Sequence, residues 1–210
     1  MRLNATAVIF LLSALGSASV AIAQEESSSP KRFEASVLAG FQALNKNDTA
    51  LPDQITNVPA VGTISYSFTR NWVAEGELAW VIPVEQDIDR GPGLTQKLKT
   101  PNILAYQAGV RADWPVNATW TPYLAAGAGA VTFLSNTDAN RFPALKDPQT
   151  AFALNFGAGT FYHFAGPVGL RADYRELVAF PSDSATGLST AGSADPIWME
   201  RGSLGVSFRF

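Results

Sequence analysis

The sequence predicts an all-β fold, an eight-stranded antiparallel up-and-down β-barrel that crosses a membrane. Three observations support this fold class. Apolar and polar residues alternate with period two in eight segments, and no helical periodicity follows the N-terminal region. The connections between the segments are alternately long and short, and the charged residues of the segments fall on one parity. The strands therefore have two faces that contact different surroundings.

The N-terminal region, residues 1–23, predicts a cleaved secretory signal peptide. It has one early cation, Arg2, then an apolar run, and it closes with the small residues of Ala21-Ile22-Ala23. An uncleaved anchor helix is the alternative, but the strongly apolar part is shorter than the ~20 residues that a bilayer span needs. The predicted organisation is a signal peptide (1–23), a polar leader (24–31) and a barrel domain (32–210).

Eight segments show the strand alternation: 33–41, 60–68, 72–82, 102–114, 121–134, 151–164, 168–180 and 198–210. Short connections such as "TRN", "PVNATW" and "AGP" alternate with long polar ones, which a soluble β-sandwich does not require. A membrane barrel has short periplasmic turns at one rim and four long extracellular loops at the other. A tilted strand needs ~9–11 residues to cross the membrane, which these segments supply.

The charged residues of the strands indicate which face is enclosed. All five lysines lie in the leader or the long loops, whereas the polar parity of the strands carries five carboxylates and five arginines. These ten are Glu34, Glu75, Glu77, Arg111, Asp113, Arg171, Asp173, Arg175, Arg201 and Arg209. Arginines matched with carboxylates suit a confined interior, because a guanidinium can pair bidentately where there is little water. A soluble lipocalin-like barrel, with the polar face outside, is the alternative.

The opposite parity is apolar and is predicted to face lipid, with large aromatic residues near the strand ends. The last strand ends on Phe210, which is predicted to be its final lipid-facing residue. Glu176 and Glu200 fall on this parity, and both are expected at the outer interface, where a carboxylate costs little. The segment "LAAGAGA" shows no clear face.

The patterns "VGTISYSFTRNWVAEGELAW" and "FGAGTFYHFAGPVGLRADYREL" resemble the small eight-stranded outer-membrane β-barrel family of Gram-negative bacteria, the OmpA-like and OmpX-like group. The resemblance covers nearly the whole chain after the signal peptide. It implies localisation in the cell outer membrane, contact with outer-membrane lipid and lipopolysaccharide, and recognition of Phe210 as a signal by the barrel-assembly machinery. Family members often carry a peptidoglycan-binding module, which is not expected here.

The predicted function is that of a structural or interaction barrel, with a plugged, salt-bridged lumen and loops that contact an external ligand. An eight-stranded barrel has an interior just wide enough for side chains to fill it. A porin-like, low-conductance pore for ions or small solutes is the alternative from another class.

Enzyme activity is not expected, and a lipid-modifying enzyme is the least favoured alternative. Hydrolysis or acyl transfer would require a serine or water activated by a histidine, and the one histidine, His163, is expected to be packed or solvated beside the "AGP" turn. Without it, general acid–base chemistry would depend on carboxylates that are already matched with arginines. Glu85, Asp87 and Asp89 lack the calcium-loop pattern, and the chain has no cysteine, so neither a metal nor another cofactor is predicted. The acidic balance gives no reason to expect nucleic acid as a partner.

Overall fold

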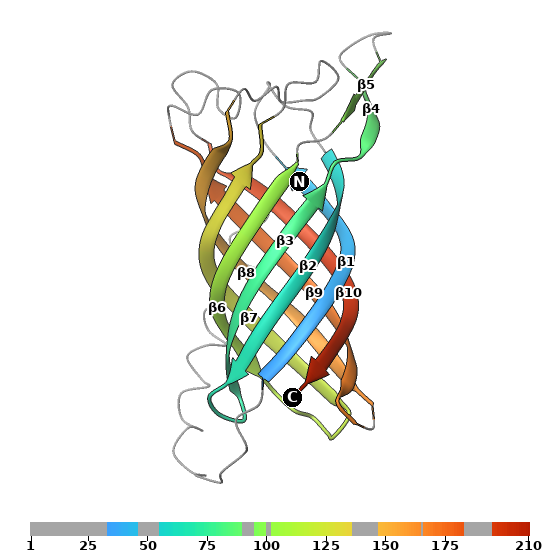
Figure 1. The fold of residues 1–210 in the computed structure, drawn as a ribbon, viewed down its shortest axis with the longest axis vertical. Helices are drawn as coiled ribbons and strands as arrows, with labels where there is room; N and C mark the ends of the chain where they lie inside the picture. Colours follow the sequence, from blue (N-terminus) through green and yellow to red (C-terminus); the bar gives the residue numbers. More distant parts are fainter. Residues whose placement is uncertain are drawn as a thin grey trace, which may run out of the picture. The chain divides into compact units, whose positions relative to one another are not determined.

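The computed structural model describes residues 33–45, 55–89, 95–99, 102–135, 147–164, 166–182 and 195–210. Eight strands form a closed barrel in the order β1-β10-β9-β8-β7-β6-β3-β2 (Figure 1). Their bounds are β1 (Phe33–Asn45), β2 (Ile55–Ser67), β3 (Trp72–Ile82), β6 (Ile103–Asp113), β7 (Trp120–Phe133), β8 (Gln149–His163), β9 (Val168–Phe180) and β10 (Ile197–Arg209). A separate two-stranded sheet joins β4 (Glu85–Asp89) to β5 (Thr95–Lys99).

The barrel is closed by antiparallel pairing of its first and last strands. The pairing of β1 with β10 runs from Glu34 opposite Arg209 to Asn45 opposite Trp198. Beyond it, Phe33 and Phe210 exchange two backbone hydrogen bonds of 3.0 and 2.9 Å. Closure satisfies the backbone groups of both terminal strands, as a hydrocarbon environment requires. The predicted eight-stranded antiparallel barrel is confirmed.

The strand bounds leave connections 68–71, 114–119 and 164–167 at one end of the barrel. At the other end the connections are 46–54, 83–102, 134–148 and 181–196. Polar side chains hold two of the short turns: Thr69 Oγ1 accepts the backbone N–H of Trp72 at 3.0 Å, and Asn117 Oδ1 accepts that of Trp120 at 2.7 Å. In the third, Gly166 has φ 105°, a conformation that glycine adopts without strain.

Two strands are longer than predicted, because β1 continues to Asn45 and β2 begins at Ile55. The prediction assigned the polar stretch 42–59 to a loop. In the structure Gln42 pairs with Asn57, and both side chains are buried on the inward face. Because these inward-facing residues are polar, this part of β1 and β2 resembled a loop in the sequence. The β4–β5 hairpin was also missed, within a segment predicted as loop.

The two faces of the wall differ as the alternation predicted. Outward apolar side chains such as Val37, Phe41 and Leu204 are exposed, at 73%, 71% and 63%, whereas inward ones are buried. Exposed aromatic residues near the short connections are Phe33, Phe68, Trp114, Trp120, Tyr162, Phe164, Phe208 and Phe210. No helix among the described residues is long and apolar enough to span a bilayer.

Glu176 and Glu200 lie directly opposite each other on β9 and β10, on the outward face. Glu200 is near the start of β10, and Glu176 is near the end of β9. Both therefore lie in the half of the barrel nearer the long connections. The sequence analysis placed both at the outer interface of the membrane, and their depth in a bilayer stays a prediction.

The lumen has two halves of different chemistry, whereas the prediction described one salt-bridged interior. The half nearer the short connections holds the charged side chains. The half nearer the long connections is filled mainly by aliphatic side chains and by Phe133. The apolar members are Leu38, Leu44, Val61, Ala79, Val81, Ile103, Ala105, Val131, Phe133, Ala151, Ala153, Leu177, Ala179, Ile197 and Met199. The ion pairs therefore fill only part of the interior.

Candidate functional site in the barrel lumen

All ten predicted charged residues face the lumen, and they come from five strands, β1, β3, β6, β9 and β10. Nine of them are buried, and Arg209 is partly exposed at the rim with the short connections. Each takes part in at least one ion pair with another member of the set. We call this set the lumen network.

Glu75 on β3 is the centre of the lumen network, because it accepts from three arginines. Arg171 donates to both of its oxygens, from Nη1 to Oε2 at 2.9 Å and from Nη2 to Oε1 at 3.1 Å. Arg111 Nη1 donates to Oε2 at 2.8 Å, and Arg175 Nη2 donates to Oε1. Ser65 Oγ adds a fourth partner at 3.2 Å. Such charge-assisted bonds are about twice as strong as neutral ones.

Asp173 on β9 is a second acceptor, two residues from Arg171 and Arg175 on the same face. Its Oδ2 accepts from Arg171 Nη2 at 3.0 Å, and its Oδ1 accepts from Arg175 Nε at 3.2 Å. The Tyr123 hydroxyl donates to Oδ2 at 2.5 Å and accepts from Arg171 Nε at 2.9 Å. Every guanidinium nitrogen of Arg171 is thereby bonded.

A third group of ion pairs lies toward the short connections. Arg111 pairs bidentately with Asp113 on its own strand, at 2.8 and 3.1 Å, and donates to Glu34 at 3.0 Å. The other oxygen of Glu34 accepts from Arg209 Nε at 3.0 Å. Arg209 Nη2 lies 2.7 Å from His163 Nε2, and since arginine can only donate, this nitrogen of His163 accepts.

Arg201 and Glu77 form a pair at the boundary between the charged and apolar halves. Arg201 Nη2 lies 2.7 Å from both carboxylate oxygens of Glu77. Arg201 comes from β10 and Glu77 from β3, with β1 and β2 between them in the strand order. This is the one ion pair that Arg201 forms among the described residues.

Two aromatic residues of the site were missed by the sequence analysis. The rings of Tyr123 and Phe161 are buried with centroids 5.1 Å apart, and the guanidinium carbon of Arg171 lies 5.1 and 5.2 Å from them. Arg111 lies 4.5 Å from the Phe161 centroid. Tyr123 pairs directly with Asp113 on β6, and Phe161 pairs directly with Arg171 on β9, so the available signal was the pairing of each aromatic with a charged residue of the adjacent strand. They give the cations a second kind of partner.

Inward glycines give these large side chains room. A Cβ atom on Gly159 would lie 2.3 Å from the Tyr123 ring, and one on Gly157 would lie 3.0 Å from Arg175 Cδ. Gly127 is similarly close to Asn155 Nδ2, at 2.9 Å. The "GAG" pattern near the end of β8 therefore reflects close packing of its two glycines against Tyr123, Arg175 and the backbone of β9.

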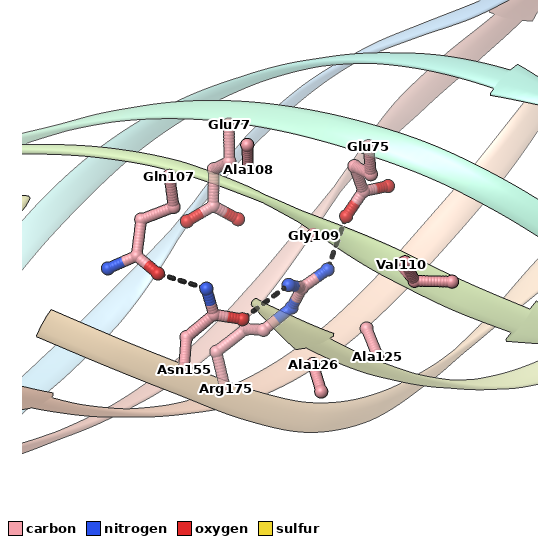
Figure 2. A pocket seen from close by; sticks show the side chains of 10 residues that line it. All are labelled: Glu75, Glu77, Gln107, Ala108, Gly109, Val110, Ala125, Ala126, Asn155 and Arg175. Carbon is pink, nitrogen blue, oxygen red and sulfur yellow. Dashed lines mark hydrogen bonds and ion pairs between the residues drawn. The ribbon is translucent and has the colours of Figure 1, made fainter. Parts of the chain in front are cut away.

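A small cavity borders the network and is shown in Figure 2. Its volume is about 10 Å³, and its lining includes Glu75, Glu77, Gln107, Asn155 and Arg175. Arg175 donates to Asn155 Oδ1 at 3.1 Å, and Asn155 Nδ2 donates to Gln107 Oε1. Such a space holds about one water molecule. Side chains from opposite walls of the barrel therefore meet at this level (Figure 2).

No group of three or more histidine, cysteine, aspartate or glutamate side chains among the described residues could hold a metal ion. Glu85 forms an ion pair with Lys99, 3.7 Å apart, across the β4–β5 hairpin. The predicted signal peptide and leader lie outside the described residues, as do the tips of the long connections.

The family model described as "Outer membrane protein beta-barrel domain" matches residues 9–210. The chain belongs to this family. Among solved structures, Neisserial surface protein A (NspA) matches with a TM-score of 0.55 at 14% identity, over 85% of this chain and 97% of that one. The outer membrane protein AlkL matches with a TM-score of 0.51 at 15% identity, over 90% and 94%. A search of curated protein sequences finds no significant match.

At these identities the two structural matches show the shared fold. The family match and the fold agree that the protein is an outer-membrane β-barrel. Family membership implies the outer membrane as its location, which the sequence analysis expected.

Proposed function

We propose that the protein is a structural or interaction barrel of the outer membrane, with a lumen closed by side chains and loops that contact external ligands. The observation that carries the proposal is the lumen network itself. Four members of the network, Glu75, Arg111, Arg171 and Arg175, converge from β3, β6 and β9, and each is at most 6% exposed. A water-filled channel would expose such side chains.

The filled lumen leaves the two rims and the outer wall as surfaces for interaction. The outer wall is apolar and suits contact with lipid and with the acyl chains of lipopolysaccharide. The four long connections supply the polar residues that a rigid barrel would present to an external ligand, as loops on rigid scaffolds often do. The barrel-assembly machinery is the expected partner during biogenesis.

The geometry around His163 supports a non-enzymatic role. Its Nε2 already accepts from Arg209, and its ring stacks on Phe161 with centroids 5.6 Å apart. A histidine acting as general base needs an unprotonated ring nitrogen directed at a nucleophile or water, whereas Nε2 is directed at Arg209. Purified protein is therefore expected to leave lipid A and phospholipid unmodified, as mass spectrometry of the lipids would show.

Planar-bilayer recording tests the closed lumen. The wild-type protein is expected to give no reproducible unitary current steps, because the Arg201–Glu77 pair and the Glu75 centre block ion passage. Reproducible steps that Arg201→Ala abolishes or alters would instead support the low-conductance pore. Glu85→Gln, which changes a charge outside the lumen, is the matched control and should leave the recording unchanged.

Ligand contact by the loops is tested separately with lipopolysaccharide as the probe. Replacing residues 183–194 by a short Gly/Ser linker should retain the folded barrel, because β9 and β10 keep their full register from Ile197–Ala179 to Phe208–Val168. The expected result is weaker lipopolysaccharide binding in a flotation assay. Equal binding by both proteins would place the interaction on other loops or on the barrel wall.

A further inference from the structure

Arg201 differs from the other buried arginines of the lumen in having two nitrogens without a partner. Its side chain is fully buried, and only Nη2 is used, by Glu77. Nε and Nη1 have no hydrogen-bond partner among the described residues. Arg171 is as deeply buried, yet its Nε, Nη1 and Nη2 all donate to protein oxygens. The contrast points to an additional partner at Arg201.

Further polar atoms without partners lie on the same stretch of wall. Ser203 is the next inward residue on β10, and its Oγ is unpaired among the described residues. Asn57 lies two strands away, since Arg201 pairs with Gln42 and Gln42 pairs with Asn57. Neither Oδ1 nor Nδ2 of Asn57, a residue with 0% exposure, has a partner in the described part of the chain. Adjacent strands are about 4.8 Å apart, so these side chains project into one region.

Leaving these atoms unsatisfied would be costly. A buried polar group without a hydrogen bond has lost its hydration without compensation, and Arg201, Ser203 and Asn57 together carry five such atoms. Native proteins satisfy nearly all such groups, with ordered water where no protein atom is available.

The charge of the region selects the kind of ligand. Glu77 already balances Arg201, and the lumen network has five carboxylates for five arginines. An added anion would therefore be an uncompensated buried charge, which is strongly unfavourable. A cation would face the Arg201 guanidinium. A neutral molecule must accept from Arg201 and Asn57 Nδ2 and donate to Asn57 Oδ1, and water does both.

We propose that ordered water molecules occupy the lumen beside Arg201, bridging it to Ser203 and Asn57. A buried water typically makes about three hydrogen bonds, which this set of donors and acceptors supplies. The barrel interior then has three layers: the ion-paired network around Glu75, a hydrated layer at Arg201–Glu77, and the apolar cluster toward the long connections. The inference holds whether or not the lumen conducts ions.

Water-edited NMR of perdeuterated, ¹⁵N-arginine- and ¹⁵N-asparagine-labelled protein in lipid bilayers tests this proposal. Magnetisation should pass from water to the Nε–H of Arg201 and to the side-chain amide of Asn57. Arg171, whose Nε–H is bonded to Tyr123, is the matched control and should receive none. The same absence of transfer at Arg201 as at Arg171 would overturn the proposal.

Two further measurements make the result specific. Asn57→Leu should reduce transfer to Arg201 while leaving Arg171 unchanged, and Ser203→Ala serves the same purpose if the leucine variant does not fold. Exchanging chloride for bromide in the buffer should leave the Arg201 signal in place. A shift with halide would show a bound anion, and it would refute water as the partner.

Discussion

Arg171 on β9 and Glu75 on β3 join walls that are four strands apart in either direction around the eight-stranded barrel. Their two parallel hydrogen bonds, of 2.9 and 3.1 Å, run across the lumen. The bidentate geometry explains why arginine is used here, since the ammonium group of lysine cannot form two parallel bonds. The pair ties strands that share no backbone hydrogen bond. It therefore connects opposite walls of the barrel through side chains.

Removing Glu75 should destabilise the barrel strongly. Glu75→Gln leaves Arg111, Arg171 and Arg175 with one carboxylate fewer, and breaking a buried ion pair costs about 3–5 kcal/mol. Urea unfolding followed by tryptophan fluorescence in lipid vesicles measures the change. The control is Glu85→Gln, because the exposed pair with Lys99 is worth at most about 1 kcal/mol. Equal stability of the two variants would contradict the assignment of Glu75 as the centre.

The Tyr123 hydroxyl should contribute to stability through its two charged partners. Tyr123→Phe keeps the ring against Phe161 but removes the bonds to Asp173 and Arg171, each of which involves a charged group. A loss of about 1.5–3 kcal/mol in the free energy of unfolding is expected. Tyr162→Phe changes an outward tyrosine of the neighbouring strand and should shift it by less than about 0.5 kcal/mol. The same unfolding assay compares the two.

Gly159 should tolerate no side chain, whereas Gly62 should. A Cβ on Gly159 would lie 2.3 Å from the Tyr123 ring, while one on the outward Gly62 would meet no atom within 4 Å. Gly159→Ala is therefore expected to cost about 1–3 kcal/mol through overpacking. Gly62→Ala should be close to neutral. The free energies of unfolding of both variants decide the matter, and an equal effect would mean that the lumen is less tightly packed than the structure indicates.

Phe210 should matter more during assembly in the cell than for the finished barrel. Its ring stacks on Phe33, with centroids 5.9 Å apart, so Phe210→Ala and Phe33→Ala both lose this contact. If Phe210 is the assembly signal, only Phe210→Ala lowers the amount of folded protein in the outer membrane, measured by heat-dependent gel mobility. Both variants should refold similarly from urea into detergent. If the two variants lose the same amount of folded protein in the cell and refold equally poorly from urea, Phe210 contributes only packing.

The barrel could be predicted from the sequence because the features that indicate it, the alternation within each strand and the lengths of the connections, are local. Parity assigned all ten charged residues to one face, and the alternation of connection lengths indicated an even number of strands. The partners within the lumen network could not be predicted, because Arg171 meets Glu75 only through the shear and tilt of a closed barrel. The period-two pattern shows which side chains point inward but does not indicate which strands face each other across the lumen.

The other differences between prediction and structure concern residues whose polar or aromatic character suggested a different environment from the one they occupy. Gln42 and Asn57 are polar and were assigned to a loop, although they face a partly polar lumen at the ends of longer strands. Tyr123 and Phe161 are aromatic, and the small residues that follow Tyr123 obscured the face of β7. In the half of the lumen nearer the long connections the inward side chains are aliphatic, so the polar residues of a strand do not by themselves identify its inward face there. The register between paired strands determines how far along the barrel axis each side chain lies. That register, which the sequence does not give, was needed to place these residues.

The orientation of the two faces is tested most directly by the position of the outward side chains in lipid. The chain has no cysteine, so single-cysteine variants can each carry one fluorescent label. Labels at Val37→Cys and Val206→Cys should be quenched by lipids brominated in mid-chain, whereas a label at Thr69→Cys, in a short connection, should not. Water-like emission and no quenching at Val37 and Val206 would contradict the account, since the apolar face would then not contact the membrane.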